Sequence, residues 1–475
     1  MPDYAACGLP ADAAFPFALI EEAVAVTGCR ERRRRRLPAV AVVVFVLGCC
    51  LFSGEGYGEV ARKLAGWLGP LAGPGRWTVP GTGALARARR RAGPAPLREL
   101  FARLAGPLAS AGTPGVSAFG RLLVALDGTF LDVPASAGNL AAFGAPPGGG
   151  LNGGGGFPQV RLVTLAACGT HGILDAVFRG RRAPGSSEQD LARKIAARGR
   201  LGRGMLVLAD RNFCGYPVVA VLTATRADVL IRAKSSQRFP VLDVLADGSY
   251  LSVLPDPAAA RAWRHRNDER RRRASPLPPD PRSALRGITV RVIEADITLI
   301  PGGGEPRSER YRLITTLADP VAAPAGAIAA CYAQRWEIET GYRELKVITR
   351  GPGRVLRSCH PAGITQEIWA LLSTCQLTQA ARTHAAAAGG HDPDRISYTV
   401  TLRAIRRALT THTPAAAITT EALTQLLPPR RHRSYPRLNN TSTSKRRTAR
   451  ARLTGTITTT ITITAPATTP DQPGP

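Results

Sequence analysis

The chain has 475 residues, 44% of them apolar, which excludes a wholly disordered protein and, at about 150 residues per domain, predicts two to four domains. Lys and Arg number 63 against 34 Asp and Glu, and the resulting charge of +29 indicates a polyanionic partner, either nucleic acid or an anionic membrane surface. The nine cysteines form no CxxC pair and no cluster at metal-ligand spacing, which argues against structural zinc and fits a reducing cytoplasm.

Residues 1–115 are predicted to be helical. The charge-free run Leu37–Phe52, which follows Arg32–Arg36, is predicted to be a buried helix, because a membrane span needs about 20 such residues and a signal peptide places its basic segment at the N-terminus. A membrane-associated protein built on this run is the alternative. After a turn, Gly58–Leu68 continues with amphipathic helical spacing. Helix, turn and helix behind a basic segment suit a small DNA-binding lobe, and equally any helical bundle.

Residues 116–215 change to short apolar runs typical of buried strands. A helix is predicted from Ser187 to about Ala197, and His171-Gly172 supplies a turn between two strands. The Gly-rich stretch Gly148–Gly156 has no Lys-Ser/Thr after it, so we interpret it as a loop and not a phosphate-binding loop. The predicted strands are Leu122–Leu126, Val160–Ala167, Ile173–Phe178 and Met205–Ala209.

Residues 216–315 are strand-rich, and the very basic run Arg261–Arg273 interrupts them. The strands predicted there are Val229–Ala233, Tyr250–Val253, Gly287–Ile293 and Arg310–Thr316. Residues 316–410 are predicted to be helical again, over Ala322–Lys346, Gly363–Ala388 and Tyr398–Leu409. The basic, Thr-rich residues 411–475 are expected to be disordered; the Ile-Thr alternation at 456–464 could pair as a strand, but disorder is preferred.

Two of the predicted strands end on a carboxylate. Leu122–Leu126 runs into Asp127, and Met205–Ala209 runs into Asp210. Strand ends of an open α/β sheet face a shared crevice, where a rigidly placed carboxylate can hold a metal ion. Asp127-Gly128 is also a common turn dipeptide. Two such acids on strands of one sheet favour a metal site over a turn.

A third carboxylate lies on the predicted helix Ala322–Lys346. At about 100° per residue, Glu339 shares a stripe roughly 60° wide with basic and phenolic groups that can bind phosphate. An ordinary solvated helix face with an Arg335/Glu339 ion pair would explain the same pattern. The other members of the stripe are Tyr332, Arg335 and Lys346, and an adjacent apolar stripe consists of Ile338, Tyr342 and Leu345.

The segment Tyr332–Lys346 reads Y-x2-R-x3-E-x6-K, which resembles the signature of bacterial DDE transposases of the insertion-sequence-four family. Leu126–Thr129 resembles the first-aspartate block of that family, and Ala209–Phe213 its second. About 80 and about 130 residues separate the acids, in the order of the family, and similar texture extends over residues 35–410. Asn212 stands where the family commonly has Gly, and Asn tolerates left-handed backbone.

The resemblance implies an α/β fold: a ribonuclease-H-like core, made of a mixed sheet flanked by helices, with a β-rich insertion and an N-terminal helical domain. Residues 1–115 would then be the helical DNA-binding domain. Residues 116–215 and 316–410 would be the two parts of the catalytic core, the second carrying the Glu helix. Residues 216–315 would be the insertion, and residues 411–475 the tail.

The resemblance also implies a site in which Asp127, Asp210 and Glu339 bind two Mg²⁺ ions, with Mn²⁺ as a substitute. Hard carboxylate oxygens suit these ions, and two ions can serve an in-line phosphoryl transfer. Water would cut DNA at the end of the element and free a 3′-OH, which would then attack target DNA. Glu337 and Glu344 lie close by on the helix, but the other motif residues align in register only on Glu339.

Basic groups around the acids are expected to contact DNA. Tyr332, Arg335 and Lys346 would hold phosphates near the scissile bond. Trp263 could stack on an unpaired base, although a partly buried surface Trp is the commoner situation. Further phosphate contacts are expected from Arg211, Arg232, Lys234 and Arg261–Arg273.

The expected partner is therefore double-stranded DNA, at the element ends and at the target, and the expected location is the cytoplasm, near the nucleoid. Bringing two ends together implies at least a dimer in the active complex. Two alternatives stay open. One is an inactive or domesticated transposase that only binds DNA, and the other is a nuclease of the same fold that cuts without strand transfer. Inverted repeats flanking the gene would support mobility.

Overall fold

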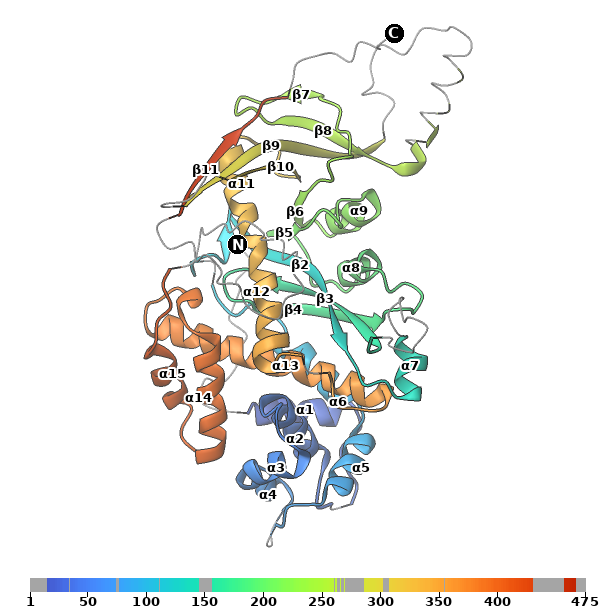
Figure 1. Cartoon of the computed structure of the whole chain (residues 1–475), viewed down its shortest axis with the longest axis vertical. Helices are drawn as coiled ribbons and strands as arrows, with labels where there is room; N and C mark the ends of the chain where they lie inside the picture. Colours follow the sequence, from blue (N-terminus) through green and yellow to red (C-terminus); the bar gives the residue numbers. More distant parts are fainter. Residues whose placement is uncertain are drawn as a thin grey trace. The chain divides into compact units, whose positions relative to one another are not determined.

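The computed structural model of the chain divides into two compact units (Figure 1). Each unit is assembled from separate stretches of the sequence, and the first three residues of strand β2 belong to the second unit. Unit 1 comprises residues 1–117, 124–195 and 336–430, and unit 2 comprises residues 118–123, 196–335 and 431–475. The structure describes residues 15–33, 35–73, 77–110, 112–144, 156–259, 261–262, 265, 269, 286–301, 307–353, 355–429 and 457–466.

The N-terminal part of unit 1 is helical, as predicted. Helix α2 is apolar on every side, and all of its residues except Val40 are buried, which confirms the buried helix expected at Leu37–Phe52. Among the described helices, none is both long enough and apolar enough to cross a membrane. The helices are α1 (Phe17–Val26), α2 (Ala39–Leu51), α3 (Tyr57–Lys63), α4 (Ala65–Leu71), α5 (Thr82–Ala92) and α6 (Ala95–Leu104).

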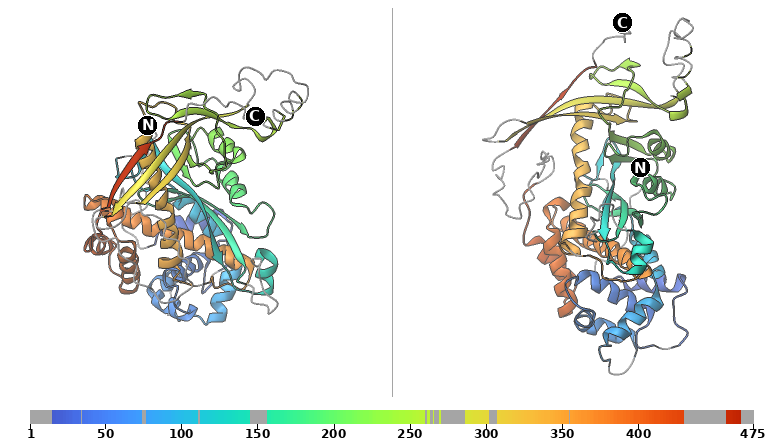
Figure 2. Two further views of the ribbon diagram at one scale, coloured as in Figure 1. Left: turned by 45° about the horizontal axis from the view of Figure 1, so that its top comes forward. Right: turned by 45° about the vertical axis from the view of Figure 1, so that its right-hand side comes forward.

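The C-terminal part of unit 1 is built around one long helix. This helix, α13, packs against α2 and α6 and is buried on most of its surface (Figures 1 and 2). His360 caps its N-terminus, where Nδ1 accepts the Gly363 N–H at 3.0 Å. The elements are α12 (Trp336–Arg343), the π-helix η3 (Glu344–Thr349), α13 (Pro361–Ala388), the 3-10 helix η4 (Pro393–Arg395), α14 (Tyr398–Thr411) and α15 (Ala416–Leu423).

Three antiparallel strands of unit 1 lie in the order β4-β3-β2. Asp127 pairs with Thr164 across β2 and β3, so the two side chains share one face of the sheet. The apolar runs predicted as strands are buried here, which confirms them. The elements are β1 (Ser117–Ala118), β2 (Arg121–Asp132), α7 (Ala137–Phe143), β3 (Gln159–Ala167), β4 (Ile173–Gly180) and α8 (Glu188–Ala196).

Unit 2 is a mixed sheet in the order β5-β6-β10-β9-β8-β7, in which β5 and β6 are parallel and the other pairs are antiparallel. Helix α9 connects the two parallel strands, as a parallel pair requires. The strands are β5 (Met205–Ala209), β6 (Asp228–Arg232), β7 (Asp243–Val244), β8 (Tyr250–Pro255), β9 (Gly287–Pro301), β10 (Arg307–Thr315) and β11 (Ile457–Ile463), and the helices are α9 (Tyr216–Ala224), α11 (Ala325–Tyr332) and the 3-10 turn η2 (Ala333–Arg335).

Three predictions about elements were wrong. The strand predicted to end at Leu126 continues through Asp127 and Gly128 to Asp132, because these residues still pair with β3, so Asp127 does not stand at a strand end. The alternation at 456–464, for which disorder was preferred, forms β11 and pairs with β9, because β9 runs to Pro301 and offers an unpaired edge to the alternating Ile and Thr side chains. The single helix expected over Ala322–Lys346 is instead α11, η2, α12 and η3, so a constant angle of about 100° per residue does not hold along it. The division into five domains stays a prediction.

Candidate active site

Asp127 lies in the middle of β2 and is half-buried. Its Oδ1 accepts the N–H of Gly128 at 2.7 Å, which fixes one oxygen of the carboxylate. The next residue faces the other side of the sheet, where a Cβ added at Gly128 would collide with the carboxylate of Glu188 on α8. Glycine at this position therefore lets a second acid approach the strand beside Asp127.

Helix α12 sits directly on this part of the strand. The Tyr342 hydroxyl donates to the backbone carbonyl of Asp127 at 2.5 Å and lies 2.9 Å from Thr164 Oγ1. Burial of this hydroxyl, together with the nearby Asp127 carboxylate, holds the pKa of Tyr342 well above its ordinary value, so Tyr342 stays a neutral donor. Glu339 is half-buried on the same helix, next to the buried Ile338. The structure therefore ties the helix of Glu339 to the backbone of Asp127.

Lys346 approaches the same strand from the π-helix η3 that follows α12. Its Nζ donates to Thr129 Oγ1 at 3.1 Å, two residues beyond Asp127. Burial and the positive charge of Arg350 lower the pKa of Lys346, and Asp132 opposes them in part. Unit 1 thus brings Asp127, Lys346 and the helix of Glu339 together.

Asp210 belongs to unit 2 and follows β5 directly. Its Oδ1 accepts the N–H of Asn212 at 2.9 Å, and its carbonyl accepts the N–H of Phe213 at 3.1 Å, which closes a tight turn. Asn212 is not among the described non-glycine residues with positive φ. The turn therefore needs no left-handed backbone at this position, and Asn in place of Gly costs it nothing on that account.

Tyr332 supports the same turn from α11. Its hydroxyl donates to the carbonyl of Ala209 at 3.1 Å, one residue before Asp210, and the side chain is buried. Burial raises the pKa of Tyr332. Arg335 lies with its guanidinium carbon 6.0 Å from the centre of the Tyr332 ring. A phosphate contact from either residue stays a prediction.

The other predicted DNA-contacting residues of unit 2 differ in exposure. Arg232 on β6 lies over the ring of Tyr311 at 4.1 Å and pairs with Glu309 at 2.7 Å. Arg211 and Lys234 are exposed. Trp263 and most of Arg261–Arg273 lie outside the described residues.

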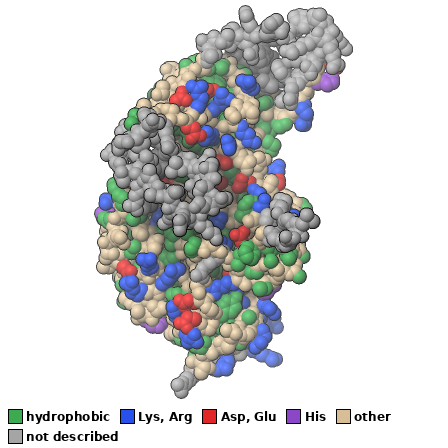
Figure 3. Space-filling view, viewed as in Figure 1, with side chains coloured by type: hydrophobic (Ala, Val, Ile, Leu, Met, Phe, Trp, Pro, Cys, Tyr) green, Lys and Arg blue, Asp and Glu red, His purple; other side chains and the backbone are tan. Residues whose placement is uncertain are grey.

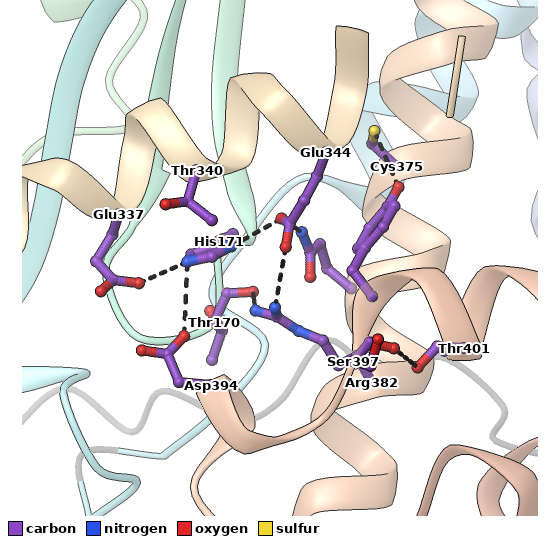
Figure 4. Close-up of polar contacts among 12 residues, drawn as sticks. Thr170, His171, Glu337, Thr340, Glu344, Cys375, Arg382, Asp394, Ser397 and Thr401 are labelled. Carbon is purple, nitrogen blue, oxygen red and sulfur yellow. Dashed lines mark hydrogen bonds and ion pairs between the residues drawn. The ribbon is translucent and has the colours of Figure 1, made fainter. Parts of the chain in front are cut away.

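A buried polar cluster lies on the other side of α12, at the turn between β3 and β4 (Figure 4). His171 Nε2 is 2.5 Å from Glu337 Oε2, and Nδ1 is 2.8 Å from Glu344 Oε2. Asp394 Oδ1 is 3.8 Å from Nε2, and Arg382 Nη1 is 3.2 Å from Glu344 Oε1. Burial and the charge of Arg382 would lower the pKa of His171. The charge of Glu344, together with the hydrogen bonds to Glu344 and Glu337, outweighs both and raises this pKa to about 10. His171 is therefore an imidazolium at neutral pH.

The sequence predicted His171 only as a turn residue and Tyr342 only as an apolar contact. A signal for the cluster exists in the pattern. Glu337 and Glu344 are seven residues apart, so they share a helix face, and each is adjacent to a residue of the predicted apolar stripe. Two acids beside an apolar stripe require a buried cation, and His171 and Arg382 supply it. No comparable signal marks Glu188, because its approach to β2 depends on tertiary packing.

The donor set of the predicted site fits a hard divalent cation. Asp127, Asp210 and Glu339 offer only carboxylate oxygens, the ligand type that Mg²⁺ and Mn²⁺ prefer. Asp127 and Asp210 each have one oxygen held by a backbone amide, which orients the carboxylate before any ion binds.

Comparison with known proteins gives sequence matches over most of the chain. Residues 118–375 match the family described as "Transposase DDE domain", and residues 11–102 match "Insertion element 4 transposase N-terminal". The chain is 25% identical over 433 residues to the transposase InsG for insertion sequence element IS4 of Escherichia coli (strain K12), which covers 88% of this chain and 89% of that protein. A cryo-EM structure of a piggyBac transposase synaptic complex with hairpin DNA aligns at 9% identity and a TM-score of 0.41, over 86% of this chain and 79% of that one. That structural likeness is weak, so the assignment rests on the sequence matches.

Proposed function

Because this chain belongs to the DDE-domain transposase family, we propose that Asp127, Asp210 and Glu339 are its catalytic carboxylates. The chain is a DNA transposase, an enzyme that cleaves DNA and transfers strands, and its family uses a divalent metal. Its mixed sheet flanked by helices fits the ribonuclease-H-like fold expected from the sequence. The observation that most supports the assignment is the hydrogen bond from Tyr342 to the backbone carbonyl of Asp127, because it joins the helix of Glu339 to the strand of Asp127.

The proposed metal is Mg²⁺, with Mn²⁺ as a substitute, held by these three carboxylates. A divalent cation bound there would supply a Lewis acid for the oxygens that attack and leave phosphorus. Tyr342 and the backbone amides of Gly128 and Asn212 would keep the acids oriented. The catalysis expected from this chain is therefore chiefly the positioning of charge around a phosphodiester.

In the proposed first step, a water oxygen attacks phosphorus at the end of the element. The bond from phosphorus to the 3′ oxygen breaks, water loses a proton, and a 3′-OH is left on the element. In the second step this 3′-OH attacks a phosphodiester of the target, and the 3′ oxygen of the target leaves. Arg335 and Lys346 are proposed to hold phosphates beside the reacting bond. Additional backbone contacts are proposed for Tyr332, Arg211, Arg232 and Lys234.

DNA is the partner that the family supports, and two copies of the chain are proposed to act together on it. The reason is chemical, because two ends of one element have to be cut and joined to one target. Light scattering can measure the mass of the complex with end DNA. We expect a mass that corresponds to two copies of the chain, and a mass that corresponds to one copy would contradict the proposal. The cellular DNA of the nucleoid is the proposed place of action.

Single-turnover cleavage of DNA carrying the end of the element tests the three acids. We expect Asp127→Asn, Asp210→Asn and Glu339→Gln each to lower Mg²⁺-dependent cleavage at least about 1,000-fold, because each removes a carboxylate on which the reaction depends. Affinity for end DNA should change little. Asp190→Asn, an acid on the surface of α8, is the matched control and should cleave normally. Near wild-type cleavage by any of the three variants would refute the assignment.

A further inference from the structure

The His171 cluster joins four separate stretches of unit 1. His171 belongs to the β3–β4 hairpin. Glu337 lies at the start of α12, and Glu344 is the first residue of η3, which continues it. Arg382 and Asp394 come from α13 and η4. Figure 4 shows the imidazole lying between Glu337 and Glu344, with Asp394 and Arg382 on the opposite side from the helix. Glu337 and Glu344, which both hydrogen-bond the imidazole, therefore lie on either side of Glu339 in the sequence.

The hairpin is held firmly enough to act as an anchor. Arg382 Nη2 donates to the carbonyl of Thr170 at 3.0 Å, and the Ile173 N–H donates to Gln376 Oε1 at 2.6 Å, so α13 holds the hairpin at two points. His171 has φ of +57°, a left-handed conformation that non-glycine residues rarely adopt. The surrounding contacts therefore hold His171 in a backbone conformation that it would otherwise avoid.

The interatomic distances favour a proton over a metal ion in this cluster. Two ligand atoms of one tetrahedral ion, each at roughly 2.1 Å from it, would lie about 3.4 Å apart. Nε2 of His171 and Oε2 of Glu337 are 2.5 Å apart, too close for two ligands of one ion, and Nδ1 lies 2.8 Å from Glu344 Oε2, the length of a charge-assisted hydrogen bond. With a carboxylate at each ring nitrogen, both nitrogens donate.

The opposite side of α12 fixes the helix to the strand of Asp127. Tyr342 binds the Asp127 carbonyl, and Lys346 binds Thr129. These contacts fix the C-terminal half of the segment, whereas Glu337 lies two residues before Glu339, at the N-terminal end. The contact between His171 and Glu337 restrains that end.

We propose that His171 is a positioning residue, which ties the two carboxylates on either side of Glu339 to the β3–β4 hairpin and so holds Glu339 at a fixed place relative to Asp127. The inference rests on the proposed role of Glu339. The imidazole touches neither DNA nor metal in this role, and acts only through α12. Loss of a contact that supports a metal-binding carboxylate is expected to lower metal affinity or activity about 10- to 100-fold.

The test uses the full chain bound to end DNA and Mn²⁺ as the probe. Mn²⁺ affinity is measured by electron paramagnetic resonance, and the cleavage rate is measured in a single turnover. His171→Gln is expected to weaken Mn²⁺ binding and slow cleavage about 10- to 100-fold each, with end-DNA affinity within about twofold of wild type. His384→Gln replaces an exposed histidine of α13 and is the matched control, expected to behave as wild type.

A second variant keeps the test decisive if His171→Gln does not fold. Glu337 is 18% exposed, so Glu337→Gln breaks one tether at the edge of the cluster. Glu337→Gln alone should weaken Mn²⁺ binding and slow cleavage. Where His171→Gln does fold, the double variant should lose less than the sum of the two single effects. Additive effects, or a lowered melting temperature with normal Mn²⁺ affinity and cleavage, would overturn the positioning role.

Different results would refute the catalytic role of Glu339 and the positioning role of His171. If Glu339→Gln abolishes Mn²⁺ binding and cleavage while folded His171→Gln and Glu337→Gln match wild type, the inference is wrong and the proposed function stands. If Glu339→Gln itself binds Mn²⁺ and cleaves normally, the proposed function is wrong and the inference falls with it.

Discussion

Some residues of the candidate site could be predicted from the sequence pattern, whereas others are brought to it only by tertiary packing. Asp127 and Asp210 could be predicted because an apolar strand that runs into an acid is visible in the sequence. The roles of Tyr342 and Glu188 could not, because each depends on which surface the α12 and α8 helices present to β2. Glu337 and Glu344 are visible beside Glu339 in the sequence, but their pairing with His171 depends on where the β3–β4 hairpin packs.

Gly128 should be intolerant of a side chain. Gly128→Ala would force the Glu188 carboxylate or β2 to move, which we expect to destabilise the chain by about 1–3 kcal/mol and to slow cleavage through Asp127. Urea unfolding and single-turnover cleavage measure both effects. Gly138→Ala on α7, where a Cβ makes an ordinary contact, is the control. If Gly128→Ala with Glu188→Ala is as unstable as Gly128→Ala alone, the overlap is not the cause.

His171 should make stability depend on pH in the alkaline range. Its pKa in the folded chain is about 10, above the value of about 6.5 expected when unfolded, so the stabilisation is complete below that lower value and is lost as pH rises through 10. The free energy of unfolding should therefore fall between about pH 7 and 10. His171→Gln should flatten this part of the curve, and an unchanged slope would contradict the ion pairs described here.

At the scale of elements, burial and alternation predicted more than helical geometry did. Met205–Ala209 is found as the predicted strand, because a run of five apolar residues between Gly204 and Asp210 is too short for a buried helix and fits a buried strand. The helix expected over Ala322–Lys346 fails as one regular element because it crosses from unit 2 to unit 1 at residue 336 and changes to a π-helix at Glu344. Local propensity carries no information about either event. The strand β11 was missed because its partner, the far end of β9, was not predicted.

Proline substitutions test β11 as a paired strand. Thr464 N–H donates to the Glu294 carbonyl, so alternate residues, Thr460 among them, direct their N–H toward β9. Thr460→Pro should lose a ladder bond at a cost of about 1 kcal/mol and expose β9 amides to hydrogen exchange. Thr459→Pro, whose N–H points away from β9, is the matched control. Equal effects of the two variants would contradict the register.

At the scale of the whole molecule, the charge of +29 predicted the kind of partner but not the position of the site. On the face shown in Figure 3, Lys and Arg side chains are spread over the view, with Asp and Glu among them. Pairs such as Arg310 with Asp296 and Arg312 with Glu294 neutralise part of this charge locally. The acids proposed for catalysis were found from motif spacing and from the apolar runs that precede Asp127 and Asp210, and charge then explains how DNA is attracted to them.

Strand transfer tests the central claim most directly. A DNA end that already carries a free 3′-OH is incubated with the chain, Mg²⁺ and a supercoiled plasmid, and joined molecules are counted by sequencing. We predict that wild-type chain joins the ends to the plasmid, and that Asp210→Asn binds the same ends but joins none. Cleavage of uncut ends without joining would make the chain a nuclease, and joining by Asp210→Asn would contradict the three-carboxylate site.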